Sequence, residues 1–208
     1  QHGAQSDGLV KSNQRRTTVK TRIIAHSQQV VRVDQEDRAT FSAQEAAPLL
    51  EWLRGNTQGF DGIFLSDYDK GLFTCPAVKG FLPELYAQTV PVVAGPKPEN
   101  LSVFRGVRCR TLNAKEAASA TGMPVDNDES TELAGKELLR LSESESVLIT
   151  RGEKGMTLFR EGADSVGEPA FATEVFDVSG AGDTVLSVVG LGLCAGLPGP
   201  TCIRLASH

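Results

Sequence analysis

The strongest constraint on the fold of this chain is a regular alternation of short apolar runs with longer segments of helical periodicity, from residue 43 onward. Short apolar or β-branched runs are typical of strands, and the segments between them are long enough for helices. Strands that alternate with helices form a mostly parallel sheet with helices on both of its faces. The sequence therefore predicts an α/β fold, and its 208 residues suit one domain.

The same patterns give the expected elements. Strands are expected at 17–25, 29–34, 62–66, 90–94, 108–112, 147–150, 156–160 and 171–176. Helices are expected from the capping box Ser42-Ala-Gln-Glu45 onward, and at 76–88, 114–121 and 131–141. Pro83 predicts a kink or a restart in the second of these helices. The first two strands are expected to join at His26-Ser27.

Composition excludes several classes of function. A net charge of −5, without a Lys/Arg-rich run, argues against a nucleic-acid-binding surface. The longest apolar stretch, Val185–Leu197, is too short to span a bilayer, and no signal peptide is visible at the start. We therefore expect no membrane partner and a cytoplasmic location. The cysteines form no C-x-x-C pair, so idle thiols are favoured over two disulfides among Cys75, Cys109, Cys194 and Cys202.

A short glycine-rich turn precedes an apolar helical run near the end of the chain. Residues 176–184 read Phe-Asp-Val-Ser-Gly-Ala-Gly-Asp-Thr, and the apolar run follows directly. Such a turn aims free backbone N–H groups at one point, where the helix macrodipole adds positive charge, so it suits a phosphoryl group or a developing anion. Asp183, in the first helical turn beside this pocket, is a candidate general base. Phosphoryl transfer to a hydroxyl needs both parts side by side.

Other interpretations of this turn are weaker. Gly-Ala-Gly alone is often only a tight turn. The dinucleotide-binding fingerprint requires a third glycine at position 185, which is Val185. A P-loop would continue with Gly-Lys-Ser/Thr, which does not follow here. An acid before the first glycine, and an acid and a threonine after the second, favour the functional interpretation.

Polar residues follow several of the expected strands. In a parallel α/β sheet, ligands bind beyond the carboxyl ends of the strands, so these residues are expected to meet at one rim. Each of them alone could be a solvated turn residue. The sets are Asp67 with Lys70, Lys97, Asn113 with Glu116, Thr150 with Gly152 and Gly155, and the 180–183 turn.

These segments together resemble the ribokinase-like (phosphofructokinase-B type) sugar kinases. The 177–184 stretch is similar to the C-terminal signature of that family, Thr150-Arg-Gly-Glu-Lys-Gly155 to its nucleotide-side loop, and Thr111–Glu116 to its Asn-x-x-Glu segment. Three further pieces are similar to the kinase domain of the bacterial heptose-phosphate kinases. They are the strands around 18–34, Leu65-Ser-Asp-Tyr-Asp-Lys-Gly71, and Gly95-Pro-Lys-Pro98.

The resemblance implies a three-layer ribokinase-like fold in which residues 17–36 form a small β lid. It implies transfer of the γ-phosphate of ATP, with Mg²⁺, to a hydroxyl of D-glycero-D-manno-heptose 7-phosphate. Asp183 would be the base, and the anion hole would consist of Gly180, Ala181 and Gly182. The implied nucleotide-binding residues are Asn113, Ala114, Lys115, Glu116, Thr150, Gly152, Gly155 and Lys97. Glu116 would bind Mg²⁺ through water, Asp67 and Lys70 would serve the substrate side, and lid strands of two subunits would pair in a homodimer.

The sequence departs from the family pattern at three positions. Gly95 stands where an acidic residue usually precedes Pro-Lys, Leu112 where proline commonly precedes the asparagine, and Asp69 where glycine is common. The loss of a carboxylate at position 95 is expected to disturb the metal or phosphate arrangement most.

The resemblance starts at the lid-like strands and ends soon after the signature helix. It therefore implies a partial kinase domain that lacks the first sugar-gripping βα units and the segment that closes the adenine pocket. Such a chain is expected to phosphorylate poorly by itself. Three alternatives stay open: a sugar or nucleoside kinase with another acceptor, a non-catalytic module that binds a nucleotide or a sugar phosphate, and a structural remnant of the fold.

Overall fold

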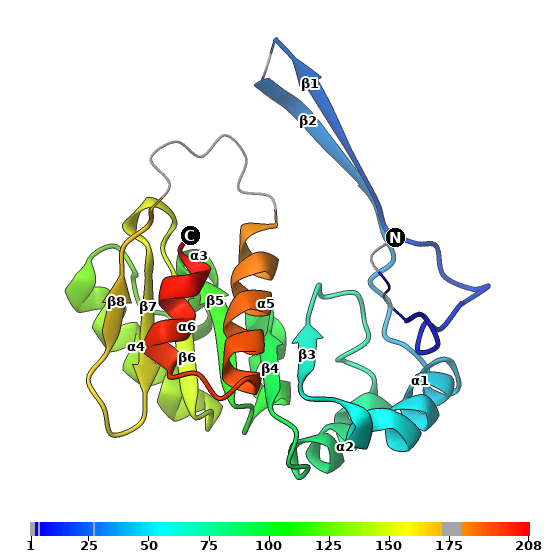
Figure 1. Cartoon of the computed structure of the whole chain (residues 1–208). Helices are drawn as coiled ribbons and strands as arrows, with labels where there is room; N and C mark the ends of the chain where they lie inside the picture. Colours follow the sequence, from blue (N-terminus) through cyan, green and yellow to red (C-terminus); the bar gives the residue numbers. More distant parts are fainter. Residues whose placement is uncertain (1–2, 4, 27, 172–179) are drawn as a thin grey trace. The chain divides into compact units, whose positions relative to one another are not determined.

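The computed structural model describes residues 3, 5–26, 28–171 and 180–208 (Figure 1). The chain forms two compact units. The first contains Gln1–Asn56 and Asp69–Phe81, and the second contains Thr57–Tyr68 and Leu82–His208.

The first unit contains a β-hairpin and a helix. Strands β1 (Val19–Ala25) and β2 (Gln28–Gln35) pair antiparallel, and α1 spans Ala43–Asn56. The predicted capping box is present, because the Ser42 N–H donates to Glu45 Oε2 at 2.8 Å and the Glu45 N–H donates to Ser42 Oγ at 3.2 Å. This pair satisfies two backbone donors at the start of α1.

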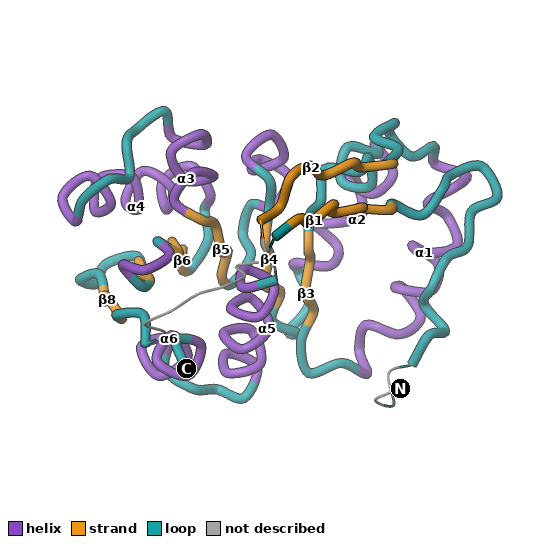
Figure 2. Tube along the Cα trace, turned by 90° about the horizontal axis from the view of Figure 1, so that it is seen from above, coloured by secondary structure: helices purple, strands orange, loops and turns teal. Residues whose placement is uncertain are grey.

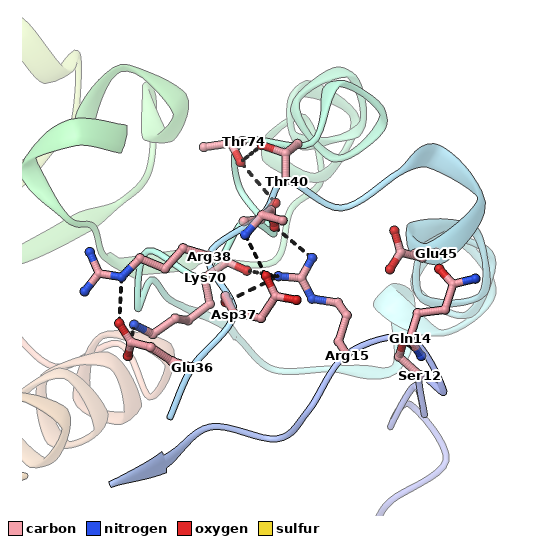
Figure 3. Close-up of polar contacts among 12 residues, drawn as sticks. Ser12, Gln14, Arg15, Glu36, Asp37, Arg38, Thr40, Glu45, Lys70 and Thr74 are labelled. Carbon is pink, nitrogen blue, oxygen red and sulfur yellow. Dashed lines mark hydrogen bonds and ion pairs between the residues drawn. The ribbon is translucent and has the colours of Figure 1, made fainter. Parts of the chain in front are cut away.

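Arg15 joins two loops of this unit (Figure 3). Its guanidinium donates to the carbonyl oxygens of Ala39 at 2.7 Å and Lys70 at 3.1 Å, and lies 3.9 Å from the centre of the Phe41 ring. The loops run so close together that a Cβ at Gly71, whose φ is +86°, would lie 1.9 Å from the Ala39 carbonyl oxygen. Only glycine fits this approach.

The second unit is built on a six-stranded sheet in the order β3-β4-β5-β6-β7-β8. Strands β3 to β6 are parallel, whereas β7 and β8 are antiparallel to their neighbours. The strands are β3 (Ile63–Ser66), β4 (Val92–Gly95), β5 (Cys109–Asn113), β6 (Ser146–Thr150), β7 (Met156–Arg160) and β8 (Val166–Glu168). The predicted mostly parallel α/β sheet is thus confirmed.

Helices cover both faces of this sheet (Figures 1 and 2). They are α3 (Ala114–Thr121), α4 (Asp128–Ser142), α5 (Ala181–Cys194) and α6 (Gly199–Ala206). Leu148 of β6 packs in one core cluster with residues of α5 and α6, while its neighbours Val147 and Ile149 pack in another with residues of α3 and α4. Since successive side chains of a strand point to opposite faces, the result is three layers.

Several elements differ from the sequence expectation. Helix α2 (Pro76–Tyr86) is continuous through Pro83, so the helix does not restart there, and the Ala87 N–H donates to the Pro83 carbonyl at 3.0 Å. Five short elements were not expected: the 3₁₀ helices Thr57–Gly59, Pro98–Phe104 and Gly152–Lys154, and the elements β8 and α6. Most of the strand expected at 171–176, from residue 172 onward, falls outside the described residues.

The expected thiols are also present, since all four cysteines are free and three of them are buried. Within the described ranges, the helices are too short or too polar for any of them to cross a membrane.

Candidate active site

A pocket of about 200 Å³ lies at the carboxyl ends of β3 to β6 in the second unit. Most of the residues that the sequence analysis placed at this rim line it. Its walls include Asp67, Tyr68, Gly95, Lys97, Asn113, Glu116, Thr150, Gly180, Gly182, Asp183 and Leu186. Ligands of α/β sheets bind at this edge, so the position fits the expected site.

The N-terminus of α5 faces this pocket without a capping side chain. Gly180 occupies the N-cap position with φ +86°, and the first helical hydrogen bond joins the Thr184 N–H to the Gly180 carbonyl at 2.9 Å. The N–H groups of the three preceding residues therefore have no acceptor within the helix. These donors and the positive end of the helix dipole suit an anion.

Asp183 lies in the first turn of α5, and its side chain is exposed at the pocket. Its Oδ2 accepts a hydrogen bond of 2.9 Å from the hydroxyl of Tyr68, two residues past the end of β3. A carboxylate beside uncapped backbone donors can take a proton from a hydroxyl group whose oxygen then attacks an anion held there.

Lys97 reaches the pocket on a loop that Asp67 holds in place. The buried Asp67 carboxylate accepts from the Lys97 backbone N–H at 3.1 Å and from Asn100 Nδ2 at 2.8 Å, both through Oδ2. The Asp67 N–H in turn donates to the Gly95 carbonyl at 3.0 Å, which extends the β3–β4 pairing into the loop. Asp67 thereby fixes the backbone that carries the Lys97 ammonium.

Asn113 and Glu116 form a capping box at the start of α3. The Glu116 N–H donates to Asn113 Oδ1 at 2.9 Å, and the Asn113 N–H donates to Glu116 Oε2 at 3.0 Å. The other Glu116 oxygen, Oε1, accepts from Lys97 Nζ at 2.6 Å. Burial by itself would lower the pKa of Lys97, but its hydrogen bond to Glu116 and the charge of that carboxylate raise it overall. The ammonium therefore stays charged and available to a phosphate.

The loop between β6 and β7 contains the glycines expected on the nucleotide side. Thr150 lines the pocket, and Gly152 and Gly155 lie beyond it in a tight turn closed by a 2.7 Å bond from the Arg151 N–H to the Gly155 carbonyl. Both glycines have positive φ, of +60° and +77°. Their backbone conformations alone thus favour glycine.

The two glycines should nevertheless respond differently to substitution. A Cβ at Gly155 would lie 2.0 Å from the Glu168 carbonyl oxygen, whereas a Cβ at Gly152 meets nothing within 4 Å. We expect Gly155→Ala to lower the free energy of unfolding by on the order of 3 kcal/mol and Gly152→Ala by about 1 kcal/mol, measured by urea denaturation. Equal losses would show that the β8 backbone does not constrain this turn.

Gly95 stands where the family usually has an acidic residue, and its effect on the metal or phosphate arrangement is expected to be the largest of the three departures from the family pattern. A Cβ at this position would lie 3.3 Å from Leu186 Cδ2 and 3.6 Å from Thr111 Oγ1. Leu186 of α5 thus packs against the position where an acidic side chain would begin. The pocket still contains three carboxylates, those of Asp67, Glu116 and Asp183.

Lys70 belongs to the first unit, where its ammonium forms an ion pair with Glu36 (Figure 3). Glu36 also accepts from Arg38 Nε at 2.6 Å. The hydrogen bond from Lys70, followed by that from Arg38, lowers the pKa of Glu36 to about 2, so the group is charged at neutral pH. The role of Lys70 toward a substrate stays a prediction.

The pocket residues are compatible with magnesium. Within the described ranges, no three His, Cys, Asp or Glu side chains gather closely enough to hold a metal ion by themselves. Mg²⁺ usually keeps several waters and binds through one or two carboxylates together with substrate phosphates. Glu116, beside Lys97 and the α5 N-terminus, suits that mode.

Comparison with known proteins identifies the family. The sequence profile of the pfkB family carbohydrate kinases matches residues 1–208. This chain belongs to the pfkB family of carbohydrate kinases.

Two curated relatives match more than nine-tenths of this chain, whereas the chain spans only about two-fifths of the length of each. The bifunctional protein HldE of Trichlorobacter lovleyi is 39% identical over 205 residues, which are 99% of this chain and 42% of that protein. HldE of Gluconacetobacter diazotrophicus is 40% identical over 193 residues, which are 92% of this chain and 40% of that protein.

Solved structures share the fold. Phosphofructokinase-2 from Escherichia coli, in complex with substrates and products, gives a TM-score of 0.72 at 14% identity, over 91% of this chain and 62% of that one. Arabidopsis thaliana ribokinase, complexed with ribose and ATP, gives a TM-score of 0.58 at 23% identity. The match covers 76% of this chain and 49% of that one. The ribokinase-like fold predicted from the sequence is thus confirmed.

The sequence analysis gave no role to two residues of the pocket region, Tyr68 and Asn100, although Tyr68 belongs to the 65–71 segment that it singled out. Tyr68 bonds a residue 115 positions away, and Asn100 bonds the buried Asp67 from an unexpected 3₁₀ helix. One available signal was the position of Tyr68, close behind a strand of the parallel sheet, where ligands bind.

Proposed function

We propose that this pfkB chain transfers the γ-phosphate of ATP to a hydroxyl of a sugar phosphate, D-glycero-D-manno-heptose 7-phosphate. One observation carries the proposal: Asp183, the uncapped N-terminus of α5 and Lys97 line the same small pocket. A base, an anion hole and a phosphate-neutralising cation are the parts that phosphoryl transfer requires. Because its donor is ATP, we place the protein in the cytoplasm.

Asp183 takes the proton of the acceptor hydroxyl in this mechanism. The oxygen then bonds to the γ-phosphorus while the bond to the β-phosphate oxygen breaks, and ADP leaves. Backbone N–H groups of Gly180, Ala181 and Gly182 stabilise the negative charge on the transferred group. Lys97, fixed by Asp67, adds a positive charge to the same region.

The nucleotide lies along the ends of β5 and β6 in this proposal. Asn113 and Glu116 are at its phosphates, with Ala114 and Lys115 in the first turn of α3, and Thr150, Gly152 and Gly155 follow its other side. Mg²⁺, held by Glu116 through water, would neutralise phosphate charge when bound. Lys97 must exchange its bond to Glu116 for one to phosphate, and because each of these partners is an anion, both favour the protonated ammonium.

The acceptor is assigned from segments on the substrate side. Asp67 and Lys70 are proposed on the substrate side, and the heptose phosphate rests on the segments around 18–34, 65–71 and 95–98 that resemble heptose-phosphate kinases.

A coupled ADP-release assay with a panel of acceptors tests this function. We expect turnover to be highest with D-glycero-D-manno-heptose 7-phosphate, compared with fructose 6-phosphate, ribose and adenosine. A higher rate with one of the latter would replace the acceptor and keep the reaction. ATP binding by calorimetry without turnover on any acceptor would indicate a nucleotide-binding module instead.

We also propose that the hairpin pairs two copies of this chain. The register of β1 and β2 places Val19, Ile23, Val31 and Val33 on one face, and each is between 44% and 51% exposed. The opposite face carries Lys20, Arg22, Arg32 and Asp34, followed by Ile24 where the register shifts. An isolated two-stranded hairpin is marginally stable, and an exposed apolar face marks an interaction surface.

Replacing Ile23 with lysine should therefore convert a dimer into a monomer, because a charge would be buried in the apolar contact. Sedimentation equilibrium measures the mass directly. Arg22→Glu, on the opposite face, is the matched control and should leave the dimer intact. A monomeric unmodified protein, or a dimer that survives Ile23→Lys, would contradict the proposed pairing.

A further inference from the structure

Tyr68 lines the pocket, and its hydrogen bond to Asp183 has no role in the proposed mechanism described above. Its hydroxyl donates to Asp183 Oδ2 at 2.9 Å, although the two residues are 115 positions apart. Tyr68 is 51% exposed, so its ring does not belong to the hydrophobic core. The bond joins the end of β3 to the first turn of α5.

The backbone of Tyr68 is held firmly at this point. Its neighbour Asp67 is buried and bonded to the Lys97 loop and to Asn100. The Asp67 N–H also continues the pairing of β3 with β4. Tyr68 therefore starts from a fixed backbone, and its side chain has only two χ angles to set.

Helix α5 is held against the same strand by close packing. A Cβ added at Gly190 of α5 would lie 2.0 Å from the Phe64 ring of β3, and one at Gly62, just before β3, would lie 2.1 Å from Cys194 Sγ. The absence of side chains at these two glycines lets the helix approach the strand closely. The distance between Tyr68 and the start of α5 is thus fixed by packing along the helix.

We infer that Tyr68 is a positioning residue, whose hydroxyl holds Asp183 Oδ2 and leaves Oδ1 of the same carboxylate to accept the proton of the acceptor hydroxyl. This inference rests on the proposed function of Asp183. An exposed aspartate exchanges between rotamers, and a base must be held within hydrogen-bond reach of its proton. The tyrosine restricts this freedom without taking part in the proton transfer.

Tyr68→Phe removes the hydroxyl and keeps the ring. We expect kcat to fall on the order of 10-fold to 100-fold, the loss of one hydrogen bond to a charged group, while the KM for ATP stays unchanged. The readout is steady-state kinetics of ADP release by the full protein, with thermal melting to confirm folding. A general loss of structure would instead raise KM and lower the melting temperature.

The matched control is Tyr86→Phe at the other tyrosine of the chain. The hydroxyl of Tyr86 donates to the Val103 carbonyl at 3.3 Å, away from the pocket lining. The control loses the same atom and one hydrogen bond, and kcat should be unchanged. Equal losses of kcat in both variants would overturn a specific role of Tyr68.

The double variant separates this inference from the proposed function. In an Asp183→Asn protein, Tyr68→Phe should cause no further loss, because the carboxylate that the hydroxyl positions is gone. If Asp183→Asn is inactive and Tyr68→Phe keeps full kcat, the positioning role of Tyr68 is wrong, whereas the role of Asp183 as the base still holds. If Asp183→Asn keeps full turnover, the proposed function fails, and the inference fails with it.

Discussion

Replacing Asp183 with asparagine is expected to lower kcat by about 10²-fold to 10⁴-fold, because general base catalysis typically contributes that much. The asparagine has nearly the same shape, so it can still accept from Tyr68 and leaves the start of α5 unchanged. The uncapped backbone donors and Lys97 remain to bind phosphate. We therefore expect the affinity for ATP, measured by calorimetry, to change little.

Asp164→Asn is a suitable control for this prediction. Asp164 lies between β7 and β8, is exposed, and carries the same carboxyl group outside the pocket lining. It should leave kcat unchanged. A reduction of less than 10-fold in Asp183→Asn would mean that another group accepts the proton.

Replacing Arg110 with methionine is expected to lower the free energy of unfolding by on the order of 3–5 kcal/mol. Arg110 of β5 is fully buried, and its guanidinium bonds Ser144 Oγ at 3.0 Å and the carbonyl oxygens of Leu101, Phe104 and Ser142. Methionine fills similar space but leaves these buried acceptors without donors.

The carbonyl acceptors belong to two elements that flank the site. Leu101 and Phe104 belong to the 3₁₀ helix that also carries Asn100, and Ser142 is the last residue of α4. Burial lowers the pKa of Arg110 to about 10, so its guanidinium is still charged at neutral pH. It therefore donates to these backbone carbonyls from inside the core.

Urea denaturation of Arg110→Met measures the effect, with Arg140→Met as the control. Arg140 is an exposed residue of α4 that pairs with Glu137 three positions earlier, and such pairs contribute about 0.5 kcal/mol or less. A loss in Arg110→Met no larger than in this control would show that the buried carbonyls find other donors.

Much of the fold could be predicted because its strands are short apolar runs. Val92–Gly95 and Ser146–Thr150 contain such runs, which a local window of the sequence reveals. The 3₁₀ helix Pro98–Phe104 lacks such a pattern, since it depends on the bonds of Asn100 to Asp67 and of Arg110 to its carbonyls. Propensity alone cannot show contacts of this kind.

The site divides in the same way. Asp183, the glycines before it and Asn113-x-x-Glu116 form local motifs, and their positions were predictable from sequence. The bonds of Tyr68 to Asp183 and of Lys97 to Glu116 join different strand ends, and they appear only when the sheet is assembled. Gly155 is a third case. It belongs to a local motif, but the backbone of β8 lies so close to it that only glycine fits, and the sequence alone does not show this contact.

The most direct test of the proposed reaction is ³¹P NMR of the protein with ATP, Mg²⁺ and D-glycero-D-manno-heptose 7-phosphate. Phosphoryl transfer predicts that the γ-phosphate signal disappears while ADP and a second sugar-bound phosphate form in equal amounts. The Asp183→Asn protein should show neither change over the same time. Release of inorganic phosphate in place of the second sugar phosphate, or equal conversion by the Asp183→Asn protein, would contradict it.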